Sequence, residues 1–419
     1  MTRPESHSSL PKVVAVPAHL RKRIKNGCAY GLGLWVVLGV AVFAAHSAEG
    51  QTLTVLYNFA GSPDGAAPVA GLVRDADGNL YGTTSGGGNN SGTVFEVSAN
   101  GTETILYSFR GKKDGSQPWA GLVRDAQGNL YGTTSYGGAF NFGVVFEVTK
   151  TGKERVLYNF KGLPDGQHPV AGLVRDAAGN FYGTTSAGGG GNCNYGAGCG
   201  TVFMLSSTGT ERVLHRFAGG TMDGGSPVAG LVRDASGNLY GTTYGGGASG
   251  LGTVFKVDPT GNETVLYSFA GYPSDGENPS AGLVWHAGNL YGTTQGGGAY
   301  RYGTVFRVTK TGRESVLYSF GGSLSDGQNP AAGVIGDAAG NLYGTTLGGG
   351  GTVCAGNGCG TVFQLTKHGK ETLLCVFTVG NDASIPFAGV ILDADGNLYG
   401  TTSNGGTARG PGTVFKLTR

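Results

Sequence analysis

The sequence predicts an all-β fold, a seven-bladed β-propeller with four antiparallel strands in each blade. Three observations predict it: a motif that recurs seven times, four strand-like segments in every repeat, and two ends that would together complete a ring. Glycine makes up 83 of the 419 residues, but the glycines recur at fixed places in the repeat. They therefore indicate turns and close contacts rather than a disordered chain.

The repeat is recognised by the segment Asn-Leu-Tyr-Gly-Thr-Thr, which first begins at Asn79. It recurs at intervals of 50 to 58 residues, with Phe181 in place of Leu in one copy. The later copies begin at Asn129, Asn180, Asn238, Asn289, Asn341 and Asn397. A unit of this length matches the four strands and connecting loops of a propeller blade.

Each unit contains four segments that are typical of short strands. In the first unit, strands A, B, C and D are expected at residues 70–75, 79–84, 92–97 and 103–109. They are rich in Val, Ile, Thr, Tyr and Phe, with turn residues between them. Strand D is apolar at nearly every position, which predicts burial on both faces. Gly82 in strand B predicts a close approach of another backbone.

The two ends of the repeat region favour a closed ring. The region opens with a single D-like segment at residues 54–59 and finishes with a C-like segment at residues 412–417. The last unit lacks a strand D of its own. We therefore predict that the first segment pairs into the last blade and that residues 51–419 form one propeller.

Residues 1–50 predict export of the repeats. A basic run at residues 21–25 precedes an apolar stretch at residues 28–45, followed by small residues. This pattern is typical of a cleaved signal peptide, and an uncleaved membrane anchor is the alternative. In both cases we expect a secreted or extracytoplasmic protein of the bacterial cell envelope, which contacts the membrane only through this segment.

The charge of the repeats argues against nucleic acid as a partner. Residues 1–50 hold six basic and two acidic side chains, so residues 51–419 carry 23 basic and 25 acidic ones, a net charge of −2. No basic surface of the kind that binds nucleic acid is expected. We expect a monomer.

The unit A-G-L-V-R-D-A-x-G-N-L-Y-G-T-T…G-T-V-F…L-Y-x-F resembles the GloVer (Gloeo_Verruco) tandem repeat of exported bacterial proteins. The resemblance covers residues 52–418, and it brings no established activity. The blade is also loosely similar to those of streptogramin lyases and NHL-type propellers. That similarity implies an alternative function, a lyase or lactonase with a site at the central mouth. Strand B ends in Thr-Thr here, where those lyases carry an acidic residue.

We place the candidate binding surface on the face that carries the B–C and D–A loops. These loops vary, whereas the A–B and C–D turns are short and uniform. The candidate ligand-binding residues are mostly aromatic side chains that break the repeat in these loops. They are Trp119, Tyr136, Phe140, Phe142, His168, Tyr195, Tyr244, Tyr300, Arg301 and Tyr302.

Such side chains could stack on sugar rings or contact a protein partner, or they could pack over the glycines of their own loops. The favoured function is a non-catalytic binding propeller for a glycan or protein ligand. A structural cell-envelope protein is a further alternative. No catalytic residue, metal ligand or cofactor is predicted.

Four cysteines are expected to form two local disulfides, Cys193–Cys199 and Cys354–Cys359, in an oxidising compartment. A zinc site is a weaker alternative because no histidine accompanies either pair at ligand spacing. Cys375 is expected to be a buried thiol. An aspartate also recurs in the D–A loops, and we interpret it as a turn cap rather than as part of a cation-binding ring. Its copies are Asp64, Asp114, Asp165, Asp223, Asp275 and Asp326.

Overall fold

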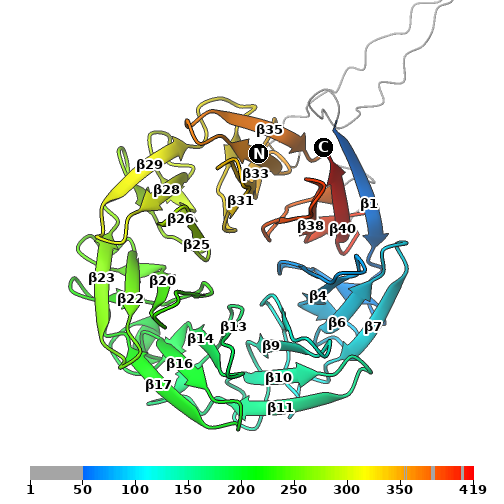
Figure 1. Cartoon of the computed structure of the whole chain (residues 1–419), viewed down its shortest axis with the longest axis vertical. Coiled ribbons are helices and arrows are strands. Elements are labelled where there is room, and N and C mark those ends of the chain that lie inside the picture. Colours follow the sequence, from blue (N-terminus) through cyan, green and yellow to red (C-terminus); the bar gives the residue numbers. More distant parts are fainter. Residues whose placement is uncertain (1–50, 353, 355, 379–382, 407–409) are drawn as a thin grey trace, which may run out of the picture. The chain divides into compact units, whose positions relative to one another are not determined.

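The computed structural model describes residues 51–352, 354, 356–378, 383–406 and 410–419, which form a seven-bladed β-propeller (Figure 1). The predicted signal peptide or anchor at residues 1–50 lies outside the described residues. Within the described residues the helical structure is one 3-10 turn, η1 (Asn194–Gly196), and no helix has the length and apolar character needed to span a membrane.

The predicted blades, each with four antiparallel strands, are confirmed. In blade 1, strands A to D are β3 (Val73–Arg74), β4 (Leu80–Thr84), β6 (Thr93–Val97) and β7 (Glu103–Ser108). In blade 2 they are β8 (Val123–Arg124), β9 (Leu130–Thr134), β10 (Val144–Val148) and β11 (Glu154–Asn159). In blade 3 they are β13 (Val174–Arg175), β14 (Phe181–Thr185), β16 (Thr201–Leu205) and β17 (Glu211–Arg216). Those of blades 4 and 5 are β19 (Val232–Arg233), β20 (Leu239–Thr243), β22 (Thr253–Val257) and β23 (Glu263–Ser268); and β25 (Val284–His286), β26 (Asn289–Thr294), β28 (Thr304–Val308) and β29 (Glu314–Ser319). Those of blades 6 and 7 are β31 (Ile335–Gly336), β32 (Leu342–Thr346), β34 (Thr361–Leu365) and β35 (Glu371–Val376); and β37 (Ile391–Leu392), β38 (Leu398–Thr402), β40 (Thr413–Thr418) and β1 (Thr52–Asn58).

Six two-stranded sheets join the D–A loop that enters a blade to the B–C loop of that blade. They are β2 (Gly65–Ala66) with β5 (Gly86–Gly87), β12 (Gly166–Gln167) with β15 (Ala187–Gly188), β18 (Gly224–Gly225) with β21 (Gly245–Gly246), β24 (Gly276–Glu277) with β27 (Gly296–Gly297), β30 (Gly327–Gln328) with β33 (Gly348–Gly349), and β36 (Ala383–Ser384) with β39 (Asn404–Gly405). In blade 2 the bridge between Ser116 and Tyr136 takes the same place.

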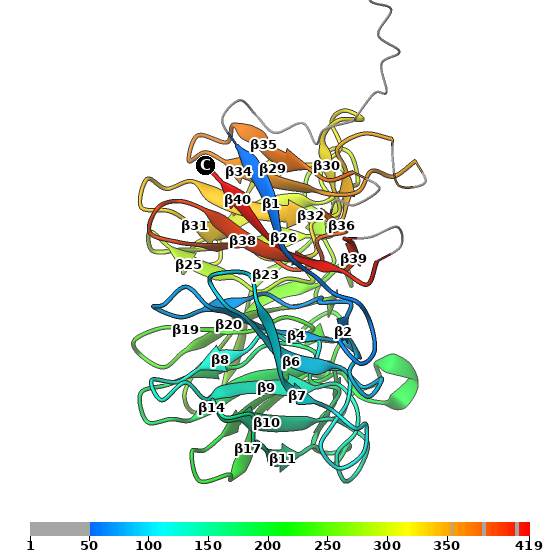
Figure 2. The same ribbon diagram turned by 90° about the vertical axis from the view of Figure 1, so that its right-hand side faces the viewer.

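Strand β1 occupies the strand D position of blade 7. It lies antiparallel to β40, with Val55 opposite Phe415 and a register shift between Val55 and Tyr57. The other C–D pairs have the same shift, as between Val94 and Phe95 of β6. The two strands lie side by side in Figures 1 and 2. Thus β1 joins the last blade with the geometry of an ordinary strand D.

Strand A is shorter than expected, with two paired residues in blade 1 instead of six. The preceding backbone contacts the neighbouring blade instead. The hydroxyl of Thr83 in strand B donates a hydrogen bond of 3.0 Å to the carbonyl oxygen of Ala120, at the start of blade 2. Equivalent bonds of 2.9 to 3.1 Å link every adjacent pair of blades. The first threonine of the Thr-Thr that recurs in strand B therefore links each blade to the next.

The glycine in strand B has a different cause from the one predicted. A Cβ atom on Gly82 would lie 2.6 Å from Cζ of Phe95, the residue opposite it in strand C, rather than against another backbone. The phenyl ring crosses the place of the missing side chain. Phe95 is fully buried, and Phe59, the residue after β1, packs edge-on against it at 5.0 Å between ring centroids.

The apolar core lies between the blades. One cluster joins Val94 and Phe109 of blade 1 to Leu130 and Phe146 of blade 2, and another joins blade 7 to blade 1. Strands B and C are buried almost throughout, whereas strand D is half-buried. The prediction of burial on both faces of strand D was wrong because this strand forms the outer rim (Figure 1).

Both predicted disulfides are present, Cys193–Cys199 and Cys354–Cys359, and Cys375 is buried. Disulfides of this kind are typical of an oxidising, extracytoplasmic compartment. The aspartates of the D–A loops cap their turns, as predicted. Asp165, for example, accepts hydrogen bonds from the backbone N–H groups of Lys161 and Gly166.

Candidate functional site

The variable loops lie together on one face of the propeller. In the side view of Figure 2, the loop strands β2, β30, β36 and β39 lie on one side, and strands β8, β19, β25 and β31 with their hairpins reach the other. The candidate binding residues of the B–C and D–A loops belong to the first side, which we call the loop face.

One residue of each D–A loop on this face has a left-handed backbone. Its φ is between 52° and 57° at Ala67, Gln117, His168, Ser226, Asn278, Asn329 and Ile385. Each precedes a proline. At His168 the backbone N–H donates to the carbonyl oxygen of Phe142 in the preceding blade, and its own carbonyl accepts from the N–H of Ser186. The same pair of bonds occurs at the other six positions, so neighbouring blades hold this uncommon conformation in place.

The side chains at these seven positions differ, although their backbones do not. The residue that follows Thr-Thr in strand B varies as well, and lies beside it. These second positions are Ser85, Ser135, Ser186, Tyr244, Gln295, Leu347 and Ser403. A fixed backbone with variable side chains is the usual construction of a binding surface. Prediction from the sequence missed most of these positions, although variation just after an invariant Thr-Thr or just before an invariant Pro would have indicated them.

A pocket of about 430 Å³ opens on the loop face over blades 2, 3 and 4. It brings together four of the predicted binding residues, Trp119, Tyr136, His168 and Tyr244. The remaining lining is small or polar: Ser135, Val170, Ser186, Ala187, Ala197, Ser226 and Val228. Trp119, Tyr136 and Tyr244 are each about 40% exposed. A concave, largely apolar site with a few polar groups is typical of small-ligand binding.

His168 is held in a defined orientation in this pocket. Its Nδ1 lies 2.9 Å from the carbonyl oxygen of Ser135, and its ring packs against Tyr136 at 4.7 Å between centroids. A carbonyl oxygen only accepts hydrogen bonds, so Nδ1 carries the proton. In the neutral imidazole, Nε2 is then an acceptor.

Ser135 contributes a polar group that its own protein does not use. The residue is 2% exposed, and its Oγ is buried and has no hydrogen-bond partner among the described residues. The equivalent serines of blades 1 and 7, Ser85 and Ser403, donate to the carbonyl oxygens of Ala67 and Ile385. A buried hydroxyl without a partner is uncommon, and one in the lining of a pocket can bond to a water molecule or a ligand there.

The other predicted binding residues lie outside this pocket. The ring of Phe142 packs over Gly162, and those of Tyr300 and Tyr302 pack over Gly322 and Gly321. The guanidinium of Arg301 lies 3.7 Å from the ring centroid of Tyr272. Phe140 and Tyr195 are exposed. In blade 5 the tyrosines of the B–C loop thus cover the D–A loop that follows the blade.

A second pocket of about 480 Å³ lies on the loop face over blades 5, 6 and 7. Tyr302 belongs to its lining, together with side-chain amides. These amides are Gln295, Gln328, Asn329 and Asn357. Asn329 already donates to the carbonyl oxygen of Gln295 at 3.0 Å. This pocket is therefore more polar than the first.

The family model of the Gloeobacter/Verrucomicrobia repeat matches residues 39–197 and 194–415. The chain belongs to this family. No curated protein matches this chain. Among solved structures, the extracellular domain of a proposed one-component system from B. thetaiotaomicron aligns with a TM-score of 0.52 and 10% identity, over 85% of this repeat protein and 39% of that chain. A copper-bound fungal alcohol oxidase of the AA5 family aligns with a TM-score of 0.52 and 16% identity, over 87% and 75% of the two chains.

A proposed 6-phosphogluconolactonase from Bacteroides uniformis aligns less well with this repeat protein, with a TM-score of 0.46 and 15% identity over 81% and 91% of the chains. At these identities the likeness concerns the fold alone. The repeat protein spans 39% of the length of the first structure. Its function must therefore be argued from its own pocket.

Proposed function

We propose that this chain is an exported, non-catalytic propeller that binds a glycan in the pocket of Trp119, Tyr136, His168 and Tyr244. The observation that carries the proposal is the meeting of these rings with the unused hydroxyl of Ser135 in one concavity. Aromatic rings stack on the apolar faces of sugars, and a buried hydroxyl and an imidazole acceptor can bond to sugar hydroxyl groups.

Binding is favoured over catalysis by the composition of the pocket. Its lining contains no carboxylate, so His168 has no acidic partner there of the kind that a lyase or lactonase mechanism would use. A sugar is favoured over a protein because the rings surround a concavity, whereas a protein partner generally needs a broad, flat contact area.

A glycan array with the purified protein, followed by calorimetry on the sugars that bind, tests the proposal. We expect Tyr136→Ala to weaken binding at least about tenfold, the size expected for loss of a stacked ring. Ser135→Ala should weaken it less, because it removes one hydrogen bond.

Tyr300→Ala is the matched control. It removes an aromatic side chain that is exposed to a similar degree on the same face but lies outside the pocket. The affinity of the Tyr300→Ala variant for the sugar should equal that of the wild type. Absence of any sugar ligand, or equal loss of binding in both variants, would overturn the proposal; the first result would favour a protein partner or a structural envelope role.

A further inference from the structure

The aspartates of the D–A loops have a common partner in five of the gaps between blades. The hydroxyl of a strand D tyrosine donates a hydrogen bond of 2.8 to 3.1 Å to the aspartate, as Tyr267 does to Asp275. The others are Tyr57–Asp64, Tyr107–Asp114, Tyr158–Asp165 and Tyr318–Asp326. A glutamate at the start of the next strand D lies close to each pair, as Glu314 does to Tyr267 and Asp275.

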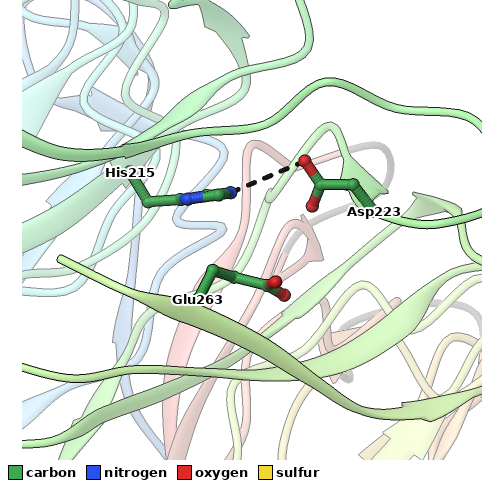
Figure 3. A group of neighbouring side chains, drawn as sticks. All are labelled: His215, Asp223 and Glu263. Carbon is green, nitrogen blue, oxygen red and sulfur yellow. Dashed lines mark ion pairs between the residues drawn. The ribbon is translucent and has the colours of Figure 1, made fainter.

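In the gap between blades 3 and 4, His215 replaces the tyrosine. His215 belongs to β17, Asp223 to the following D–A loop, and Glu263 begins β23 of blade 4. One ligand atom from each residue lies within 4.8 Å of the other two. Figure 3 shows the imidazole of His215 and the carboxylate of Asp223 facing one another, with Glu263 beside them on a separate strand.

Two atoms of this cluster lack the partners that buried polar atoms normally have. Nε2 of His215 and Oε1 of Glu263 are buried and have no hydrogen-bond partner among the described residues. Nε2 lies 3.6 Å from Oδ2 of Asp223, an ion-pair distance that exceeds the length of a hydrogen bond. The glutamates of the tyrosine gaps also have an Oε1 without a partner, so the imidazole nitrogen, in place of a short tyrosine–aspartate hydrogen bond, is what sets this gap apart.

The carboxylate of Asp223 is held in place by the backbone. It accepts hydrogen bonds from the N–H groups of Ala218, at 2.7 Å, and Gly224, at 2.6 Å. The disulfide of Cys193 packs directly against Gly219 in the same loop. The side chains of His215 and Asp223 are 18% and 16% exposed, whereas the ligand atoms Nε2 of His215 and Oε1 of Glu263 are themselves buried. The carboxylate of Asp223 is thus preformed, and an ion enters the cluster with a small movement of the surrounding side chains.

The spacing and chemistry of these groups suit a metal ion. Imidazole nitrogen and carboxylate oxygen bind Zn²⁺ at about 2.0 to 2.2 Å, which places two ligands of a tetrahedral ion about 3.4 Å apart. The observed 3.6 Å between His215 and Asp223 is close to this separation, and the three ligand atoms all lie within 4.8 Å of one another. Two carboxylates would balance the charge of a divalent cation, and one imidazole favours a transition metal over Ca²⁺ or Mg²⁺.

We propose that His215, Asp223 and Glu263 bind one divalent transition-metal ion, with a fourth position open to water. The ion joins the outer strands of blades 3 and 4 and the loop between them, and none of its three ligands lines the aromatic pocket. No metal ligand was predicted from the sequence, because an aspartate and a glutamate equivalent to Asp223 and Glu263 are also present in the gaps that hold a tyrosine. Only the exchange of that tyrosine for His215 makes this gap different.

The purified protein, stripped with EDTA and then given ZnCl₂, tests the site. We expect one zinc ion per chain by elemental analysis after gel filtration, and an increase in Tm with zinc. His215→Tyr installs the residue of five other gaps, so it should fold normally, have a Tm at or above that of the metal-free wild type, show no Tm increase with zinc, and bind no zinc. Glu263→Gln should weaken zinc binding at least about tenfold, because the loss of a ligand should cost no less than the loss of an outer-shell partner.

His368→Gln controls for adventitious binding to surface histidines, because His368 is exposed in a C–D turn. This variant should retain the zinc content and the zinc-dependent Tm increase of the wild type. The proposal fails if zinc leaves the Tm of the wild type unchanged. It fails equally if His215→Tyr retains stoichiometric zinc, or if His368→Gln loses it.

Discussion

The hydroxyl of Thr401, in the last blade, donates a hydrogen bond of 3.1 Å to the carbonyl oxygen of Ala70, at the start of the first blade. The two residues are 331 positions apart in the chain. The bond completes the series of bonds between blades that begins with Thr83 and Ala120. It is separate from the pairing of β1 with β40 at the outer rim. The ends of the propeller therefore meet at two separate places.

Thr401→Val should measurably weaken this junction. Valine keeps the shape but removes the donor, which leaves a buried carbonyl without its partner and costs about 1–3 kcal/mol. Denaturant unfolding compares the variant with the wild type. Thr104→Val, on the exposed side of β7, controls for the exchange itself and should change the free energy of unfolding little. Equal stability of both variants would show that the bond is dispensable.

The contact of Gly82 with Phe95 predicts a second effect. Gly82→Ala places a methyl group where the phenyl ring lies and should lower the free energy of unfolding by about 1–3 kcal/mol or more. Gly71→Ala is the matched control, because its Cβ would meet no atom within 4 Å. It should remain within about 1 kcal/mol of the wild type. A Gly82→Ala protein of wild-type stability would contradict the packing described for strand B.

The glutamates between the blades predict that stability falls as pH rises. Burial raises the pKa of Glu314 and of Glu371 to about 7, and the charges of Asp275 and Asp326 add to this effect. Oε1 of each is buried and has no hydrogen-bond partner among the described residues. Below about pH 4.5 the folded and unfolded chains both hold these protons. Above that pH the unfolded chain loses them first, so stability declines until the folded groups ionise near pH 7.

The double variant Glu314→Gln and Glu371→Gln tests this dependence, since glutamine stays neutral. Its Tm should fall less than that of the wild type between pH 5 and pH 8. An identical pH profile of Tm in both proteins would show that these two carboxyl groups do not cause the loss of stability with rising pH.

The sequence is sufficient to predict the blades, because the contacts that build them use residues present in every copy. Gly82 with Phe95 and Thr83 with Ala120 are repeated around the ring. The pocket is only partly predictable. Tyr136 and His168 differ visibly from the repeat, whereas Ser135 resembles the serines of other blades. Its role depends on a hydroxyl left without a partner, which no pattern of residue types reveals.

The most direct test of the central claim is the fluorescence of Trp119, titrated with a sugar identified on the array. If the pocket binds the glycan, emission should change with saturation at the calorimetric Kd. In Trp119→Phe the change should disappear while binding persists, because phenylalanine keeps a ring that can stack. Binding of the sugar without any change in Trp119 emission would contradict the assignment of this pocket.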